Sequence, residues 1–282
     1  MRHVGRHIEH LCRFVQVSRG GYYKWLKQVD KPDKDREDFL LINELFHRGR
    51  AKHGWRTIEM KLLENGVQMN HKKISRIMNK YHLFTKIRRC NPYKAIMKTS
   101  IEHRTFENKL NREFTVSVPF KIFSTDITYI PLNYRFAYLS VVKDVASGEI
   151  VAWNLSMHLE MDLVLNTLEA MKNNPVLVDV SLQDALIHSD QGFHYTNPQY
   201  IAGVSGMNMV QSMSRRGNCI DNAPIESFFG HFKDDVDYRA CKTFEALRLL
   251  IAQYVQYYNN ERQQWDRKKM TPVGYRNHLL TA

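Results

Sequence analysis

The chain has 282 residues, of which 43% are hydrophobic and 25% are charged. This is an ordinary globular composition, and the length allows one large domain with a smaller one attached. The sequence has no apolar run long enough for a transmembrane helix and no apolar signal core after Met1, so we expect a cytoplasmic protein without membrane contact.

The net charge of +12 is concentrated in the first part of the chain. Residues 1–113 contain 26 Lys and Arg against 12 Asp and Glu, a net charge of +14, whereas residues 114–282 contain 15 against 17, a net charge of −2. Nine basic residues and no acidic residue lie between Asn65 and Ile101. This asymmetry predicts a separate N-terminal module that binds the phosphates of nucleic acid.

The N-terminal segment 7–26 predicts two short helices. Apolar residues at helical spacing cover its first half, and Val17 and Ser18 interrupt the pattern where Ser18 can cap a second helix. Two short helices joined by a tight turn outline a DNA-binding helix-turn-helix. The alternative is a small helical hairpin that packs on a neighbouring element.

Three further helices are predicted over Asp35–Arg48, Thr57–Glu64 and His71–Tyr81, the last of them capped by Asn70. The basic residues of that last helix are Lys72, Lys73, Arg76 and Lys80. A basic helix after a glycine turn fits a recognition helix in the major groove of DNA. The alternative is a solvated charged face, but the absence of an acidic partner favours DNA.

Residues 85–113 show no convincing periodicity and contain Arg88 and Arg89. We interpret this segment as a basic linker that lies along a DNA backbone, a contact that does not depend on base sequence. The predicted organisation is therefore a helical DNA-binding region of the helix-turn-helix type over 1–84, the linker over 85–113 and a catalytic domain over 114–282.

The remaining sequence predicts an α/β domain. Three strands joined by turns come first, and helices and strands then alternate, which is the order expected for a mixed sheet covered by helices. The predicted strands are 120–131, 135–145, 149–157, 185–188 and 207–212, and the predicted helices are 161–173, one opening at Pro198, one opening near Pro224, and 243–260. The basic tail 262–282 is predicted to end irregularly.

Three carboxylates occupy positions typical of a metal site. Asp126 lies inside an apolar strand, Asp190 ends another strand, and Glu226 lies in the first turn of a helix, with thirty-five residues between it and Asp190. Hard divalent cations prefer such oxygen ligands, and two of them can clamp the attacking and leaving oxygens of a phosphoryl displacement. Alternatively, the three are a solvent-facing strand residue, a loop cap and a carboxylate favoured by the helix dipole.

Lys233 lies seven residues after Glu226, nearly two full turns, and so falls on the same helix face. It is a candidate to hold a neighbouring phosphate, the alternative being an exposed lysine. Further candidates for DNA contact are Arg215 and Arg216, in the polar loop before this helix, and Arg262. Asp144 is left out of the site, and His188 and His194 are expected to be structural.

The motifs around these residues resemble the second-reading-frame transposases of the insertion sequence 3 family and, more broadly, the retroviral integrase superfamily. The resemblance covers nearly the whole chain and departs from the family pattern only at positions such as Phe123 and Gln264, away from the three carboxylates. The motifs are HSDQG at 188–192, SMSRRGNCIDNAPIESFFGHFK at 212–233, YNNER at 258–262 and TPVGYR at 271–276.

The resemblance implies an RNase H-like integrase catalytic core in which Asp126, Asp190 and Glu226 bind two Mg²⁺ ions, with Mn²⁺ as a substitute. It also implies cleavage and strand transfer of double-stranded DNA at the terminal inverted repeats of an element and at a target, by an oligomer on the nucleoid DNA. An upstream-frame transposase protein, separate or fused, is an expected partner. The alternatives are a hydrolytic nuclease of the same fold and a catalytically idle DNA-binding regulator.

Overall fold

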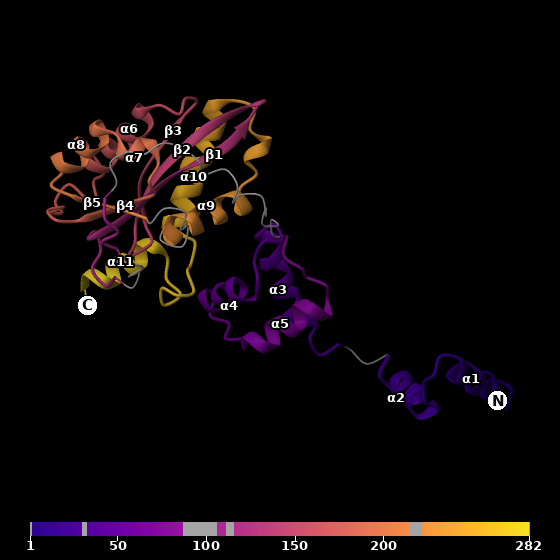
Figure 1. Ribbon diagram of the computed structural model, residues 1–282. Coiled ribbons are helices and arrows are strands. Elements are labelled where there is room, and N and C mark those ends of the chain that lie inside the picture. Colours follow the sequence, from indigo (N-terminus) through magenta and orange to yellow (C-terminus); the bar gives the residue numbers. More distant parts are fainter. Residues whose placement is uncertain (1, 30–32, 87–105, 111–115, 215–221, 282) are drawn as a thin grey trace. The chain divides into compact units, whose positions relative to one another are not determined.

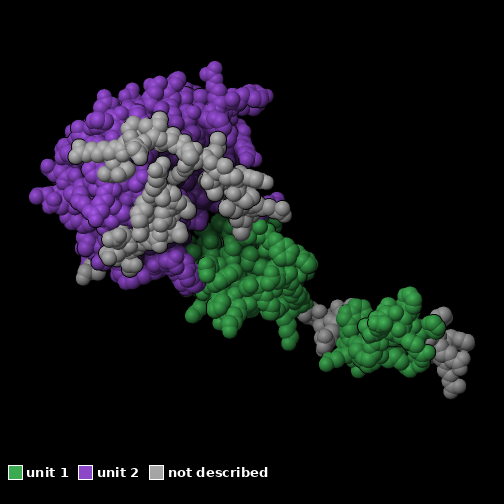
Figure 2. Space-filling model, viewed as in Figure 1, with its two compact units in different colours: residues 1–85 green, residues 86–282 purple. Residues whose placement is uncertain are grey.

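The computed structural model describes residues 2–29, 33–86, 106–110, 116–214 and 222–281 (Figure 1). The chain divides into two compact units, residues 1–85 and residues 86–282 (Figure 2). Among the helices of the described ranges, none is long and apolar enough to cross a membrane.

The first two helices of unit 1 are joined by a short turn, as predicted. α1 spans Arg2–Phe14 and α2 spans Arg19–Val29. The Ser18 hydroxyl accepts a hydrogen bond from the Gly21 N–H at 3.0 Å and so serves as the expected cap of α2. Both helices expose large apolar side chains, including Phe14 and Trp25.

The other three helices of unit 1 enclose a core of their own. α3 spans Arg36–Arg48, α4 spans Trp55–Glu64 and α5 spans His71–Lys80, close to the predicted ranges. The Asn70 side chain accepts from the Lys72 N–H at 2.8 Å, which confirms the predicted cap of α5. The apolar faces of all three helices meet in a buried cluster that includes Ile42, Leu45, Phe46, Ile58, Leu62, Ile74 and Ile77.

Unit 2 contains a five-stranded mixed sheet, which confirms the predicted fold class. β1 pairs antiparallel with β2 and parallel with β4, β2 pairs antiparallel with β3, and β4 pairs parallel with β5, in the order β3-β2-β1-β4-β5. The strands are β1 (Ile122–Leu132), β2 (Arg135–Asp144), β3 (Ile150–Ser156), β4 (Leu186–Ser189) and β5 (Val210–Met213).

Helices cover both faces of this sheet, each over a separate apolar core (Figure 1). Because side chains alternate along a strand, β1 contributes Ile130 to one core and Phe123 to the other. α9 (Ala223–Asp235) and α10 (Phe244–Asn260) pack on the first core. On the second lie α6 (Met161–Lys172), α7 (Phe193–Thr196) and α8 (Pro198–Gly206).

The tail of the chain differs from the prediction. Instead of ending irregularly, it forms a last helix, α11 (Pro272–Thr281). The Thr271 hydroxyl accepts from the Gly274 N–H at 3.1 Å, and Arg276 forms an ion pair of 2.7 Å with the buried carboxylate of Glu149. The threonine cap followed by proline was a readable helix-start signal, whereas the ion pair with Glu149 depends on the tertiary fold.

Part of the predicted linker belongs to unit 2. Leu110 is buried, and the Lys109 N–H donates to the Ser212 hydroxyl at 3.0 Å. Phe106 packs against the second core of the sheet. Residues 106–110 therefore lie on the α/β unit, next to β5.

Candidate active site

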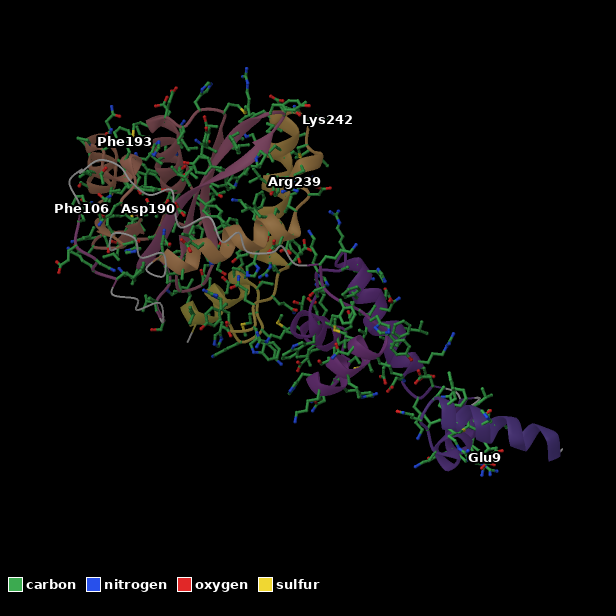
Figure 3. All side chains as sticks on the ribbon, turned by 45° about the vertical axis from the view of Figure 1, so that its right-hand side comes forward. Glu9, Phe106, Asp190, Phe193, Arg239 and Lys242 are labelled. Carbon is green, nitrogen blue, oxygen red and sulfur yellow. The ribbon has the colours of Figure 1, made fainter. Side chains whose placement is uncertain are left out.

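Asp126 and Asp190 occupy equivalent positions on neighbouring strands. The parallel register of β1 and β4 pairs Ser124 with His188. Asp126 lies two residues beyond Ser124, and Asp190 lies two residues beyond His188. Adjacent strands are about 4.8 Å apart, so this register brings the ends of the two segments that carry the aspartates onto neighbouring strands. Figure 3 labels Asp190 in this part of unit 2, away from Arg239 and Lys242.

Both aspartates are partly exposed and each is oriented by a backbone amide. The Ile127 N–H donates to Asp126 Oδ1 at 2.8 Å, and the Gly192 N–H donates to Asp190 Oδ1 at 2.9 Å. A Cβ atom at position 192 would lie 2.8 Å from Asp190 Oδ1, so the glycine of the HSDQG motif allows the chain to turn closely around this carboxylate.

The charges of Asp126 and Asp190 both contribute to the raised pKa values of two tyrosines. Burial raises the pKa of the Tyr195 hydroxyl, and the carboxylates of Asp126 and Asp190 raise that pKa further. Burial also raises the pKa of Tyr129, with added contributions from Tyr138 and from the same two aspartates. The two carboxylates therefore share one electrostatic environment.

Glu226 lies on the helix that covers the same face of β1 as Asp126. The Ser124 hydroxyl donates to Asn222 Oδ1, at the start of α9, and Lys233 donates to the Thr128 hydroxyl. Since alternate residues of a strand share a face, Asp126 faces α9 together with its neighbours at 124 and 128. Glu226 itself is exposed in the first turn of α9.

The described side chains do not close into a metal cluster. Across residues 2–29, 33–86, 106–110, 116–214 and 222–281, no group of three or more His, Cys, Asp and Glu side chains is placed to hold a metal ion. The donor chemistry nevertheless fits a hard divalent cation, because Asp126 and Asp190 offer partly exposed carboxylate oxygens, which such cations prefer as ligands. Glu226 would complete the set from α9.

Lys233 reaches the strand that carries Asp126. Its ammonium group hydrogen-bonds with Thr128, two residues beyond Asp126 on the same face of β1. The side chain is partly buried and so differs from a fully solvated surface lysine.

Two other ionisable groups near the strand ends, His188 and Asp144, are buried and hydrogen-bonded. His188 is fully buried and hydrogen-bonds with the hydroxyls of Ser212 and Ser214 at 2.9 and 3.2 Å, linking β4 to β5 and its following residue. Asp144 is also fully buried, and it accepts from the Phe120 N–H and from both the N–H and the hydroxyl of Ser147. Burial raises the pKa of Asp144.

Three of the four basic residues of α5 have acidic partners, contrary to the prediction. Arg76 forms two hydrogen bonds of 2.7 and 2.8 Å with Asp35, and Lys80 contacts both Asp33 and Asp35. Lys73 pairs with Asp38 at 2.6 Å. The hydrogen bond from Lys80 is the main cause that lowers the pKa of Asp33 to about 2. These partners precede α5 by about forty residues in sequence and therefore lie outside the basic stretch between Asn65 and Ile101.

A groove lies along the other side of α5. It is lined by Trp55, His71, Lys72, Ser75, Arg76 and Asn79. Lys72 is exposed there. Arg76 lines this groove and also forms the ion pair with Asp35, so its side chain takes part in both features.

The remaining predicted DNA contacts fall into two groups. Arg88, Arg89, Arg215 and Arg216 lie outside the described residues. Arg262 is partly buried within unit 2, where its guanidinium lies 3.5 Å from Asp235 and over the ring of Tyr258.

Two polar contacts at the start of α9 are not apparent from the sequence. Lys143, on β2, is buried beneath the start of α9, where its ammonium donates to the Pro224 carbonyl at 3.0 Å. Burial lowers the pKa of Lys143. The sequence pattern places Ser124 in the strand around Asp126 but does not indicate that its hydroxyl contacts Asn222 at the start of α9. A charged lysine in the apolar pattern of β2 was the one available signal.

Known families match three parts of the chain. Residues 32–90 match an HTH-like domain, and residues 117–219 and 226–280 each match an integrase core domain. Transposase InsK for insertion sequence element IS150 of Escherichia coli K12 is 33% identical over 275 residues, which cover 96% of this chain and 93% of that protein. The chain belongs to the insertion sequence 3 family of transposases.

Two further similarities cover different shares of the chain. The 31 kDa protein of insertion element IS600 from Shigella sonnei is 28% identical, and the match covers 96% of this chain and 100% of that protein. The HTLV-2 integrase catalytic core domain, solved in complex with magnesium in its dimeric form, is 14% identical and covers 56% of this chain and 97% of that chain, with a TM-score of 0.43.

Membership of the family makes unit 2 an RNase H-like integrase catalytic core, as predicted. The HTH-like match begins at residue 32 and therefore covers α3–α5. α1 and α2 lie before it, so the alternative of a packing hairpin remains open for them. The family is one of DNA transposases, and the chain is accordingly an enzyme of the transposase and integrase class.

Proposed function

We propose that unit 2 cuts and joins DNA at a site formed by Asp126, Asp190 and Glu226. The observation that supports this proposal is the parallel register of β1 and β4, in which Asp126 and Asp190 each follow the pair Ser124 and His188 by two residues, while α9 covers the same face of β1. When bound, two Mg²⁺ ions, or Mn²⁺ in their place, would supply activation of the attacking oxygen and stabilisation of the leaving oxygen.

Each side chain has a distinct part in this proposal. The three carboxylates hold the cations, and backbone amides keep one oxygen of each aspartate oriented. Lys233 holds a phosphate next to the reacting one as a point charge, because its ammonium lies beside the strand that carries Asp126. The site thus binds one DNA strand between the end of β4 and α9.

The DNA itself is held by the HTH-like helices. We propose that the groove along α5 contacts DNA through Lys72, with Arg76 at its border, while Lys73 and Lys80 primarily hold α5 against the acidic start of α3. The substrates would be the terminal inverted repeats of an element and a target duplex. An oligomer bound to DNA and an upstream-frame partner protein complete this proposed assembly.

Two other functions use the same features. A hydrolytic nuclease would nick element-end DNA without joining its 3′ end to a target, and an idle regulator would bind DNA without cutting it. The three carboxylates in their family positions favour an active enzyme over the regulator.

A strand-transfer assay on matched element-end DNA tests the proposal. The parent chain should cut and join, whereas Asp126→Ala, Asp190→Ala and Glu226→Ala should each lose both products while binding DNA as before. Asp162→Ala, in the first turn of α6, is a matched acidic control that should remain active. Products of nicking without joining would assign the nuclease, and activity in a carboxylate variant would refute the site.

A further inference from the structure

Helix α9 is fastened to β1 at both ends. At its start, the Ser124 hydroxyl donates to Asn222 Oδ1 at 2.6 Å, and Asn222 Nδ2 donates to the Thr125 carbonyl at 3.2 Å. Near its end, Lys233 donates to the Thr128 hydroxyl. Residues 222–233 therefore lie along residues 124–128 of the strand.

Along their own elements, Asp126 and Glu226 both lie between these two attachments. Asp126 directly follows Thr125, whose carbonyl is bound by Asn222. Glu226 follows Asn222 by four residues, which is about one helical turn and about 6 Å along the axis. The Asn222 contacts are thus the attachment nearest to both carboxylates along their own elements.

The Asn222 side chain is used in an unusual way for its position. An asparagine at a helix N-cap normally accepts from the backbone N–H groups of its own first turn. Asn222 makes no such bond in α9, and only 3% of its surface is exposed. Both functional ends of its amide are instead directed at β1, one as acceptor and one as donor.

Only an amide of this length satisfies both groups on β1. An aspartate could accept from Ser124 but would place a second oxygen against the Thr125 carbonyl, and alanine would leave both partners without this contact. Buried polar groups that lose a partner destabilise the arrangement they hold. The identity of residue 222 is therefore tied to the placement of α9 on the strand.

We propose that Asn222 is a positioning residue that fixes Glu226 relative to Asp126 and thereby sets the affinity of the site for divalent cations. This inference rests on the proposed function, in which these two carboxylates share the cations. Residues that orient metal ligands without touching the metal typically change its affinity about 10–100-fold when removed.

The chain contains a matched control for Asn222. Asn259, on α10, is also buried, and its amide accepts from the Ile150 N–H and donates to the Ile150 carbonyl, both at 2.9 Å. Like Asn222, it fastens a helix to a strand with one acceptor and one donor. Asn259→Ala therefore removes a comparable attachment on β3, away from β1 and β4.

Mn²⁺ binding to the full-length chain, followed by electron paramagnetic resonance, measures the effect directly. Asn222→Ala should weaken Mn²⁺ binding by about tenfold or more, and strand transfer by this variant should recover as Mn²⁺ is raised. Asn259→Ala should lower the midpoint of urea unfolding to a similar extent but bind Mn²⁺ like the parent. Asn222→Asp should not restore parental affinity.

Parental Mn²⁺ affinity in a folded Asn222→Ala chain would overturn the inference, and so would an equal loss in Asn259→Ala. If Asn222→Ala does not fold, Ser124→Ala replaces it, because this variant removes only the 2.6 Å contact and should weaken Mn²⁺ binding in the same direction. Unchanged binding there also overturns the inference. Unchanged Mn²⁺ binding in Glu226→Ala would instead refute the proposed function.

Discussion

His231 makes the stability of the catalytic unit depend on pH. It lies on α9 between Glu226 and Lys233, and burial lowers its pKa from 6.5 to about 4, with Arg262 adding to the shift. In the folded chain the imidazole stays neutral between these values, whereas in the unfolded chain it takes up a proton below 6.5. The free energy of unfolding therefore falls as the pH decreases from 6.5 to 4. Below pH 4, His231 is protonated in both states and causes no further change in this free energy.

The size of this effect follows from the shift of the pKa. A difference between 6.5 and about 4 corresponds to at most about 3.5 kcal/mol at about 1.4 kcal/mol per pH unit, and partial exposure of the side chain reduces this to about 2 kcal/mol. His231→Gln, which does not titrate, should lose this pH dependence. Asp144 and Glu149 titrate in both proteins, so their contributions cancel in the difference.

Urea unfolding between pH 4 and pH 7.5 measures the difference. Trp25 and Trp55 are replaced by Phe in all proteins, so that fluorescence from Trp153 and Trp265 reports on unit 2. His158→Gln, an exposed position after β3, is the control and should keep the parental slope. If His231→Gln loses as much stability as the parent between pH 6.5 and pH 4, His231 is not the source of this pH dependence.

Two further predictions concern positive charges. Lys233→Ala should bind Mn²⁺ normally but lose most strand transfer, and Lys233→Arg should retain much of that activity. Thr128→Val removes only the contact of Lys233 on β1 and should stay active. Parental strand transfer by Lys233→Ala would show that Lys233 has no part in the reaction. Lys72→Ala should reduce the slope of log affinity for DNA against log salt concentration by about 0.9, for one lost phosphate contact. Lys80→Ala should change this slope less, because Lys80 pairs with Asp33. Equal slopes for the two variants in a filter-binding assay would contradict the assignment of DNA contact to Lys72.

Local signals in the sequence are sufficient to predict most of the helices and strands and their order. Alternation of apolar residues identified β1 to β3, and local capping residues such as Ser18 and Asn70 marked where α2 and α5 begin. The spacing of the three carboxylates and their motifs identified the family. These signals are local, because a strand face, a helix cap and a motif are each encoded within a few neighbouring residues.

Contacts between residues that are far apart in the sequence are apparent only from the tertiary structure. It paired Arg76 with Asp35, brought Arg276 of the unpredicted α11 to Glu149, and turned Asn222 from the start of its own helix toward β1. Each of these contacts joins residues that are 41 to 127 positions apart. No local pattern encodes such a contact, because its free energy depends on burial and on partners that exist only after the sheet and its covering helices have assembled.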